Sequence, residues 1–259
     1  MVDKVALVTG ASSGIGEATA RRLQESGFTV YAVARRVERM GALADRGVRT
    51  VRADLTVDAD LVALVERVIE ETGRVDVLVN NAGYGSYGSL EEVPLDEARR
   101  QFEVNVFGLA RLVQLVLPHM RAQRSGCIVN VSSMGGRFGE PLGDWYHATK
   151  FAVEGLSDSL RPELAPFGIH VVVIQPGSVS TEWGAIAADH LVEVSGDGPY
   201  AEQAAKSAAV LRLSRHGEPT GSPPEVIADA VVKAATASRP RTRYRVGQLA
   251  KPFVVARKL

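Results

Sequence analysis

Tyr146 and Lys150 are the two residues of this sequence that are best suited to acid–base chemistry. They stand four positions apart in a segment of helical periodicity, so their side chains share one face of the expected helix. A free tyrosine has a pKa of about 10, and lowering that pKa by three units takes roughly 4 kcal/mol. An ammonium about 4 Å away, at an effective dielectric near 20, supplies about 4 kcal/mol. The pair could therefore transfer a proton, although such a pair, taken alone, is more often a surface feature.

A glycine-rich turn, TGASSGIG, spans residues 9–16 between a predicted strand and a predicted helix. Its glycines let the backbone approach a pyrophosphate closely, and the helix N-terminus offers unpaired N–H groups to an anion. The spacing is GxxxGxG rather than GxGxxG, and a glycine motif by itself also fits an ordinary tight turn. If the turn holds a dinucleotide, the expected contacts are Gly10, Ser12, Ser13, Gly14, Ile15 and Gly16.

Two arginines, Arg35 and Arg36, follow the second predicted strand about 20 residues after the glycine turn. An NAD-binding protein of this design carries an acidic residue there, which bonds to the ribose hydroxyl. A guanidinium can instead hold a 2′-phosphate through two charge-assisted hydrogen bonds. The pattern predicts NADP(H) rather than NAD(H), with Arg35 as the first contact, unless both arginines are solvated surface charges.

Alternating strands and helices must position these residues. Short apolar runs predict strands at 4–9, 29–33, 49–52, 75–79, 127–131 and 170–174, with a weaker candidate at 244–246. Helical periodicity and length predict helices at 15–26, 60–72, 95–123, 145–167 and 224–238.

Nearly all-apolar strands that alternate with helices fit a parallel sheet covered on both faces. We therefore predict an α/β fold, with residues 1–259 forming a single doubly wound, Rossmann-type domain around a central parallel sheet of about seven strands. Residues 182–222 fit no strand, and they are expected to form a substrate-binding insertion of loop and helix at the carboxyl ends of the strands.

Five segments together resemble the short-chain dehydrogenase/reductase family. They are TGASSGIG at 9–16, NNAG at 80–83, VSS at 131–133, YHATK at 146–150 and PGSVST at 176–181. The resemblance implies that Tyr146 is the general acid and base, that Lys150 lowers its pKa and holds the nicotinamide ribose, and that Ser133 bonds the substrate oxygen. It also implies that Asn105 completes the catalytic set. Ser133 is preferred to Ser132 because the family serine usually stands thirteen positions before the tyrosine.

The same resemblance extends the cofactor site beyond the glycine turn. It implies contacts from Tyr146 and Lys150 and from Asp54, Leu55, Asn81, Ala82, Gly83, Pro176, Gly177, Val179 and Thr181. Structural alternatives stay open for some of these positions. Asn105 could tie its helix to a neighbouring loop, Asp54 could cap the next helix, and Thr181 could cap the segment after it.

The expected substrate is a lipophilic secondary alcohol or ketone, or an aldehyde, held by loops at 84–90, 134–144 and 182–221. This expectation comes from the resemblance of YHATKFAVEGLSDSLRPEL and PGSVST to the branch that contains 17β-hydroxysteroid and retinol dehydrogenases. Five residues could line its pocket or belong to the core: Phe138, Leu142, Trp145, Trp183 and Ile186. One alternative is reduction of a 3-ketoacyl thioester, for which Arg137 could meet an acidic carrier. Another is an NADP(H)-sensing regulator without turnover.

The composition of the chain limits which binding partners and which cellular compartment are expected. Lysine plus arginine equals aspartate plus glutamate at 30 each, so no nucleic-acid partner is expected. The single cysteine, Cys127, excludes an intramolecular disulfide and a cysteine cluster for zinc, which favours the cytoplasm and predicts no metal. No apolar run approaches about 20 residues, so no membrane span is expected. The family resemblance implies a homodimer or homotetramer formed through the helices at 95–123 and 145–167.

Overall fold

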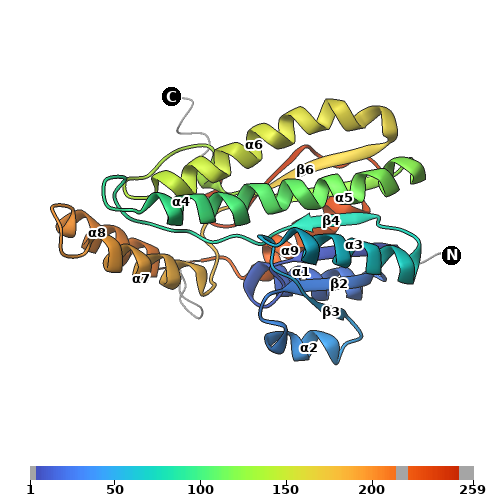
Figure 1. Ribbon diagram of the computed structural model, residues 1–259, viewed down its shortest axis with the longest axis horizontal. Helices are drawn as coiled ribbons and strands as arrows, with labels where there is room; N and C mark the ends of the chain where they lie inside the picture. The colour runs from blue at the N-terminus through green and yellow to red at the C-terminus, as the bar shows by residue number, and fades with distance from the viewer. Residues whose placement is uncertain (1–3, 214–220, 251–259) are drawn as a thin grey trace.

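The centre of the protein is a parallel sheet of seven strands, seen in a computed structural model that describes residues 4–213 and 221–250 (Figure 1). The strands are β1 (Val5–Thr9), β2 (Thr29–Ala34), β3 (Arg49–Arg52), β4 (Val77–Asn80), β5 (Gly126–Val131), β6 (Ile169–Pro176) and β7 (Arg243–Val246). Their order is β3-β2-β1-β4-β5-β6-β7, and every neighbouring pair is parallel. The predicted α/β fold is confirmed, and the weak candidate at 244–246 lies in β7.

Helices connect the strands close to the predicted positions. The longer ones are α1 (Gly14–Glu25), α3 (Asp58–Thr72), α4 (Leu95–Phe102), α5 (Gly108–Gln123), α6 (Asp144–Leu164) and α9 (Pro224–Thr236). Shorter turns are η1 (Val37–Met40), α2 (Gly41–Ala44), η3 (Met134–Gly136) and η4 (Ala165–Phe167). The predicted helix at 95–123 contains a π-helical segment, η2 (Glu103–Phe107), which joins α4 to α5. Such widened turns often occur at functional sites, and this one contains Asn105.

Each face of the sheet buries its own apolar core, because successive strand side chains point to opposite faces. Leu7 and Val33 belong to the core that also contains residues of α3, α5 and α6. Ala6 and Val8 belong to the core that contains residues of α1 and α9. Helices cover both faces, so a ligand site is left to the ends of the strands.

Two further helices, α7 (Trp183–Ser195) and α8 (Ala201–Arg212), extend from one end of the molecule (Figure 1). Their buried residues, including Leu191 and Ala204, form a third apolar cluster with Tyr146. The sequence predicts a substrate-binding insertion of loop and helix over 182–222, but it gives neither the number nor the bounds of these helices. Residues 214–220 of that segment lie outside the described residues.

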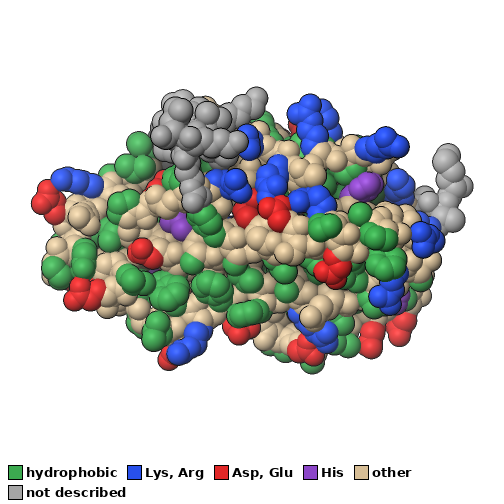
Figure 2. All heavy atoms as spheres, turned by 90° about the horizontal axis from the view of Figure 1, so that it is seen from above, with side chains coloured by type: hydrophobic (Ala, Val, Ile, Leu, Met, Phe, Trp, Pro, Cys, Tyr) green, Lys and Arg blue, Asp and Glu red, His purple; other side chains and the backbone are tan. Residues whose placement is uncertain are grey.

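The surface mixes polar and apolar side chains. Seen from above, hydrophobic side chains lie among acidic and basic ones (Figure 2). Among the residues that the structure describes, no helix combines the length and the apolar character needed to cross a membrane.

Candidate active site

A cavity of about 950 Å³ lies at the carboxyl ends of the strands and is lined by residues that follow β1, β2, β4, β5 and β6. Doubly wound sheets hold their ligands at this edge, where the strand order reverses. Nearly all predicted site residues line it: Gly10, Ser12, Ser13, Gly14, Ile15, Arg35, Arg36, Asp54, Leu55, Asn81, Ala82, Gly83, Ser133, Tyr146, Lys150, Pro176, Gly177, Val179 and Thr181. Gly16 and Asn105 are the two predicted residues that do not.

The glycine turn after β1 is packed too closely to accept larger side chains. Gly10 and Gly14 have φ angles of +67° and +56°, which favour glycine. A Cβ on Gly10 would lie 2.8 Å from the Cα of Ala82, and a Cβ on Gly16 would lie 2.2 Å from the carbonyl oxygen of Gly10. Gly16 therefore lets α1 pack against the turn, while the rest of the turn faces the cavity.

Hydrogen bonds join this turn to the NNAG segment that follows β4. The Thr9 hydroxyl accepts from the N–H groups of Asn81 and Ala82, each at 3.0 Å. The side-chain amide of Asn81 donates to the carbonyl of Thr9 at 3.0 Å. The two segments form one rigid floor on which the backbone comes close to the cavity, as a bound pyrophosphate requires.

Arg35 and Arg36 lie at the end of β2, and their exposed side chains line the cavity. Nearby, a carboxylate oxygen of Asp54 accepts from the N–H of Thr56 at 3.0 Å and from its hydroxyl at 2.9 Å. Burial opposes ionisation of Asp54, but these hydrogen bonds and the charges of Arg35 and Arg100 outweigh it and lower its pKa. Asp54 thus forms a turn with Thr56 and does not stand at the N-cap of α3.

A charged contact links the β2 side of the cavity to the beginning of α7. The guanidinium of Arg39, in η1, donates two hydrogen bonds to the carboxylate of Glu182, at 2.8 and 3.2 Å. Glu182 is the N-cap residue of α7 and lines the cavity. A Cβ on Gly14 would lie 3.0 Å from Cγ2 of Thr181, so this segment passes directly over the glycine turn. The sequence carries no sign of the pair, because its members are 143 positions apart.

Tyr146 and Lys150 lie on α6, and both line the cavity. Their side chains are nearly buried, at 8% and 7% exposure. The Nζ of Lys150 lies 5.9 Å from the centre of the Tyr146 ring and donates to the carbonyl of Val131 at 3.0 Å. The Trp183 ring covers the tyrosine from the α7 side, with 5.0 Å between ring centres.

Burial controls the protonation of both groups. It raises the pKa of Tyr146 to about 12, while a hydrogen bond with Ser133 lowers this pKa and the charge of Glu140 raises it. Burial also lowers the pKa of Lys150 to about 8, against the charge of Glu154, which raises it. The spacing on the helix predicts that Lys150 lowers the pKa of Tyr146. Loss of hydration of the phenolate is the largest effect on this pKa and raises it, and the part of Lys150 stays a prediction.

Ser133 is the serine that bonds to Tyr146. Its side chain is hydrogen-bonded to the phenol, and its Oγ also accepts from the N–H of Gly135 at 3.0 Å. The hydroxyl of Ser132 donates instead to the carbonyl of Lys150 at 3.5 Å. The structure therefore places the preferred serine, thirteen residues before the tyrosine, beside the phenol.

His147 is a site residue that the sequence reasoning missed. Its Nε2 accepts from the N–H of Glu140 at 3.1 Å, so its proton lies on Nδ1, which donates to the carbonyl of Gly135 at 2.8 Å. Gly135 is also the residue that donates to Ser133. The histidine thus fixes the loop of the serine to the helix of the tyrosine, and a single buried histidine carries no sequence pattern that would reveal this.

Asn105 lies behind the wall of the cavity, in the π-helical segment. Its side chain accepts from the N–H of Tyr84 at 3.1 Å and donates to the carbonyl of Tyr84 at 2.9 Å. It also donates to the hydroxyl of Thr149 at 3.1 Å. This geometry matches the structural alternative, in which Asn105 ties its helix to a neighbouring loop, and it adds a tie to α6.

Aromatic side chains form the wall around the phenol. Of the five candidate pocket residues, Phe138, Trp183 and Ile186 line the cavity, and Leu142 and Trp145 do not. Leu142 packs in the apolar cluster of α7 and α8, and Trp145 packs edge-on against α4.

Tyr87 also belongs to this wall. The sequence predicts only that its loop, 84–90, holds the substrate, and it does not single out Tyr87. Its ring centre lies 5.7 Å from that of Tyr146 and 6.0 Å from that of Trp183. Burial raises the pKa of Tyr87, so the phenol is neutral in the physiological pH range. The wall next to the tyrosine on α6 is therefore largely aromatic, and Glu140 is the charged residue that acts on both phenols.

Comparison with known proteins gives a consistent result. A family model described as short chain dehydrogenase matches residues 4–190. A 3-ketodihydrosphingosine reductase from Bacteroides thetaiotaomicron is 38% identical over 251 residues, which is 96% of this chain and 90% of that protein.

Solved structures agree with this result. A short-chain dehydrogenase from Streptomyces avermitilis is 35% identical and superposes with a TM-score of 0.84, over 99% of this chain and 92% of the other. A short chain dehydrogenase/reductase from Burkholderia phymatum, solved in complex with NAD, is 25% identical with a TM-score of 0.82, over 98% and 91% of the two chains.

Proposed function

The chain belongs to the short-chain dehydrogenase/reductase family, and we propose that it is an NADP(H)-dependent oxidoreductase that moves a hydride between nicotinamide and a secondary alcohol or a ketone, or an aldehyde. The observation that carries this proposal is that Ser133, Tyr146 and Lys150 line the same cavity as the glycine turn. A non-catalytic sensor has no evident need of this cluster.

The nicotinamide, when bound, would supply or accept the hydride. Tyr146 would donate its proton to the carbonyl oxygen during reduction and take it back during oxidation. Ser133 would hydrogen-bond the same oxygen, and Lys150 would hold the ribose and favour the phenolate by its charge. A pKa of about 12 keeps Tyr146 in its donor form, so reduction needs no earlier deprotonation.

The residues around the cavity fit a dinucleotide. Gly10, Gly14 and Gly16 let the backbone come close to a pyrophosphate, and a Cβ on Gly83 would lie 3.7 Å from Nζ of Lys150. The Burkholderia relative holds NAD, so family membership alone does not select the coenzyme. Arg35 supports NADP(H), because it lies at the end of β2, lines the cavity and can bond a 2′-phosphate.

The proposed substrate is lipophilic. Phe138, Trp183 and Ile186 line the cavity, and the ring centres of Trp183 and Tyr87 lie 5.0 and 5.7 Å from that of Tyr146. The name of the Bacteroides relative, a reductase of 3-ketodihydrosphingosine, is consistent with such a ketone. Arg137, the residue that could meet an acidic carrier, is not among the residues that line the cavity, and its guanidinium lies 4.0 Å from the carboxylate of Glu154.

We further propose one domain over 1–259, in which 182–222 binds the substrate. The enzyme would act in the cytoplasm, in line with its single cysteine. It would be a homodimer or homotetramer formed through α4, α5 and α6. The exposure of Leu95, Phe107 and Phe151, at 56%, 55% and 37%, supports this assembly.

The direct test is oxidation of NADPH against a panel of ketones and aldehydes, with the wild-type protein and with Tyr146→Phe. We expect turnover with lipophilic ketones, and a loss of about 10²- to 10⁴-fold in the variant. Tight NADPH binding by the wild-type protein, without turnover of any substrate, would contradict the enzymatic proposal and favour the sensor.

A further inference from the structure

The loop between β5 and α6, residues 132–143, takes part in the cavity in two ways. Near its beginning stands Ser133, which lines the cavity and is the N-cap of the short turn η3. Toward its end stand Phe138 and Glu140, which also line the cavity. The course of this loop therefore determines both where the serine hydroxyl lies and how the cavity is bounded.

His147, on α6, is bonded to this loop through both of its ring nitrogens. Its Nδ1 donates to the carbonyl of Gly135 at 2.8 Å, and its Nε2 accepts from the N–H of Glu140 at 3.1 Å. The first bond reaches the serine end of the loop, because the N–H of Gly135 donates to Oγ of Ser133 at 3.0 Å. The second bond reaches the end that lines the cavity. One imidazole, in a single neutral tautomer, thus holds both ends.

The imidazole has little room to move. It is 5% exposed, and its ring centre lies 5.6 Å from that of Tyr146 and 6.0 Å from that of Phe138. A Cβ on Gly135 or on Gly143 would lie 2.9 Å from atoms of the ring. Because the ring lies between these two glycines in a close-packed site, loss of either hydrogen bond should displace the loop rather than the histidine.

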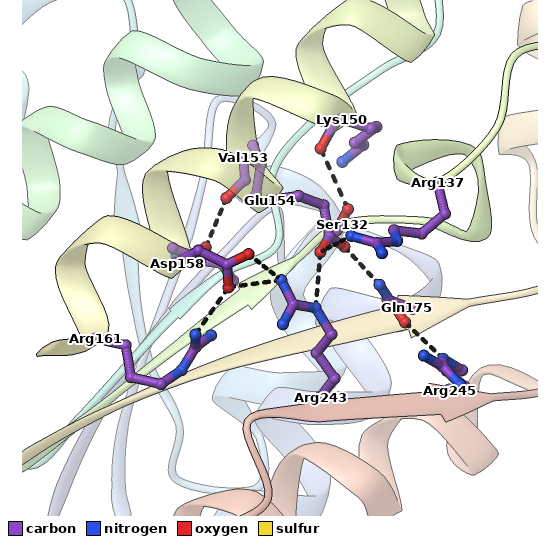
Figure 3. A network of polar contacts seen from close by, with 12 residues as sticks. Ser132, Arg137, Lys150, Val153, Glu154, Asp158, Arg161, Gln175, Arg243 and Arg245 are labelled. Carbon is purple, nitrogen blue, oxygen red and sulfur yellow. Dashed lines mark hydrogen bonds and ion pairs between the residues drawn. The ribbon is translucent and has the colours of Figure 1, made fainter. Parts of the chain in front are cut away.

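The loop has a third attachment, on the side away from the histidine. Arg137 points toward Glu154, and a guanidinium nitrogen lies 4.0 Å from its carboxylate (Figure 3). Glu154 has closer partners in Gln175 at 2.8 Å and Arg243 at 2.9 Å. Arg137 is not among the residues that line the cavity. Its attachment therefore serves as a control for the general rigidity of the loop.

We propose that His147 is a positioning residue with two separable tasks: its Nδ1 places the Ser133 hydroxyl for the reaction, and its Nε2 places the cavity wall for the substrate. The proposal rests on the proposed function, in which Ser133 bonds the substrate oxygen and this loop contacts the substrate. Neither bond involves the glycine turn or the arginines after β2, so coenzyme binding lies outside both tasks.

The test separates the two nitrogens by two variants. The side-chain amide of asparagine stands at the position of Nδ1, so His147→Asn keeps a donor for Gly135 and loses the acceptor for Glu140. The side-chain amide of glutamine reaches the position of Nε2, so His147→Gln keeps the acceptor and loses the donor. Steady-state kinetics with a reducible ketone and fluorescence titrations with NADPH are measured for both variants, for His147→Ala and for Arg137→Ala.

The two variants should affect different kinetic constants. In His147→Asn we expect KM for the ketone to rise about tenfold, with kcat within about twofold of the wild-type value. In His147→Gln we expect kcat to fall about tenfold with KM nearly unchanged, because the displaced hydroxyl no longer meets the substrate oxygen. His147→Ala should combine both effects. Arg137→Ala should keep both constants, and Kd for NADPH should stay within about twofold in all four variants.

Two results would overturn the inference. One is that His147→Asn and His147→Gln change kcat and KM in the same proportion, or change neither constant. The other is that Arg137→Ala reproduces their effects, which would mean that the loop needs only general rigidity. If one histidine variant does not fold, the other is compared with Arg137→Ala in the same way. All these results leave the proposed function intact as long as the wild-type protein turns over, whereas absence of turnover in the wild-type protein would contradict the proposed function itself.

Discussion

The ammonium of Lys150 lies 5.9 Å from the centre of the Tyr146 ring and is bonded to the carbonyl of Val131. The backbone at the end of β5 thus fixes the position of the lysine beside the phenol ring. The pKa values of both residues are shifted by the same cause, loss of hydration, and each shift favours the neutral form of that side chain.

Lys150 should therefore reduce stability in the pH range where it is charged. Its pKa falls from 10.5 in the unfolded chain to about 8 in the folded protein, so between these values the unfolded state binds more protons and stability rises with pH. Below pH 8 the charged lysine lowers the free energy of unfolding by a constant amount, roughly 3 kcal/mol. Guanidinium unfolding of the wild-type protein and of Lys150→Met should show a gap in free energy at pH 7 that closes toward pH 10. Tyr146, whose pKa rises from 10.0 to about 12, contributes mainly above pH 10 and so adds little to the gap in this range. Parallel curves would contradict this prediction.

Removal of the Ser133 hydroxyl should slow turnover without loss of NADPH binding. Ser133→Ala loses the hydrogen bond to Tyr146 and the one expected to the substrate oxygen, so we expect a fall in kcat of about 10²-fold. Ser132→Ala is the matched control, because that hydroxyl makes a 3.5 Å contact with a backbone carbonyl. Steady-state kinetics of both variants check this, and equal losses would refute the assignment of Ser133.

Arg35→Ala should weaken NADPH binding and spare NADH. Loss of charge-assisted hydrogen bonds to a 2′-phosphate costs about 1.5–3 kcal/mol, which is about 10- to 100-fold in Kd. Arg46→Ala is the control, because Arg46 is exposed, pairs with Glu25 at 3.7 Å and does not line the cavity. Kd values for both nucleotides are read from fluorescence titrations. An equal loss for NADPH and NADH in Arg35→Ala would exclude the phosphate contact.

The ion pair of Arg39 and Glu182 should slow the release of coenzyme. Both side chains are partly exposed, so the effect is modest, and we expect Arg39→Ala to release NADPH about threefold faster in stopped-flow measurements. The exchanged double variant, Arg39→Glu with Glu182→Arg, should restore the slower rate. Release at the wild-type rate in Arg39→Ala would show that the pair has no part in holding this segment.

The central strands could be predicted from the sequence because both faces of the sheet are covered there, which makes strands such as β1 and β4 short apolar runs. The edge strand β7 (RYRV) is only half-buried, so its pattern is weaker. The bounds of helices α7 and α8 could not be predicted, because small residues such as Ala187 and Ala204 form their buried side and give only a weak periodic pattern.

The residues of the candidate site also fall into two groups, those that the sequence could predict and those that it could not. Gly10, Tyr146 and Lys150 belong to local motifs, so their types and spacing reveal them. His147 depends on partners from a neighbouring loop, which only the folded chain brings together. The direction of the pKa shift of Tyr146 also depends on burial, which the spacing of residues in the sequence does not show.

The cavity is lined by residues from Thr9 near one end of the chain to Leu249 near the other. Gln248, which also lines it, follows β7, and its backbone N–H donates to the hydroxyl of Ser222 at 2.9 Å. During synthesis on the ribosome, the glycine turn is made first, yet the enclosing wall is incomplete until translation has passed β7. A nascent chain interrupted before that strand would therefore lack part of the pocket, and coenzyme would be captured only late in biogenesis.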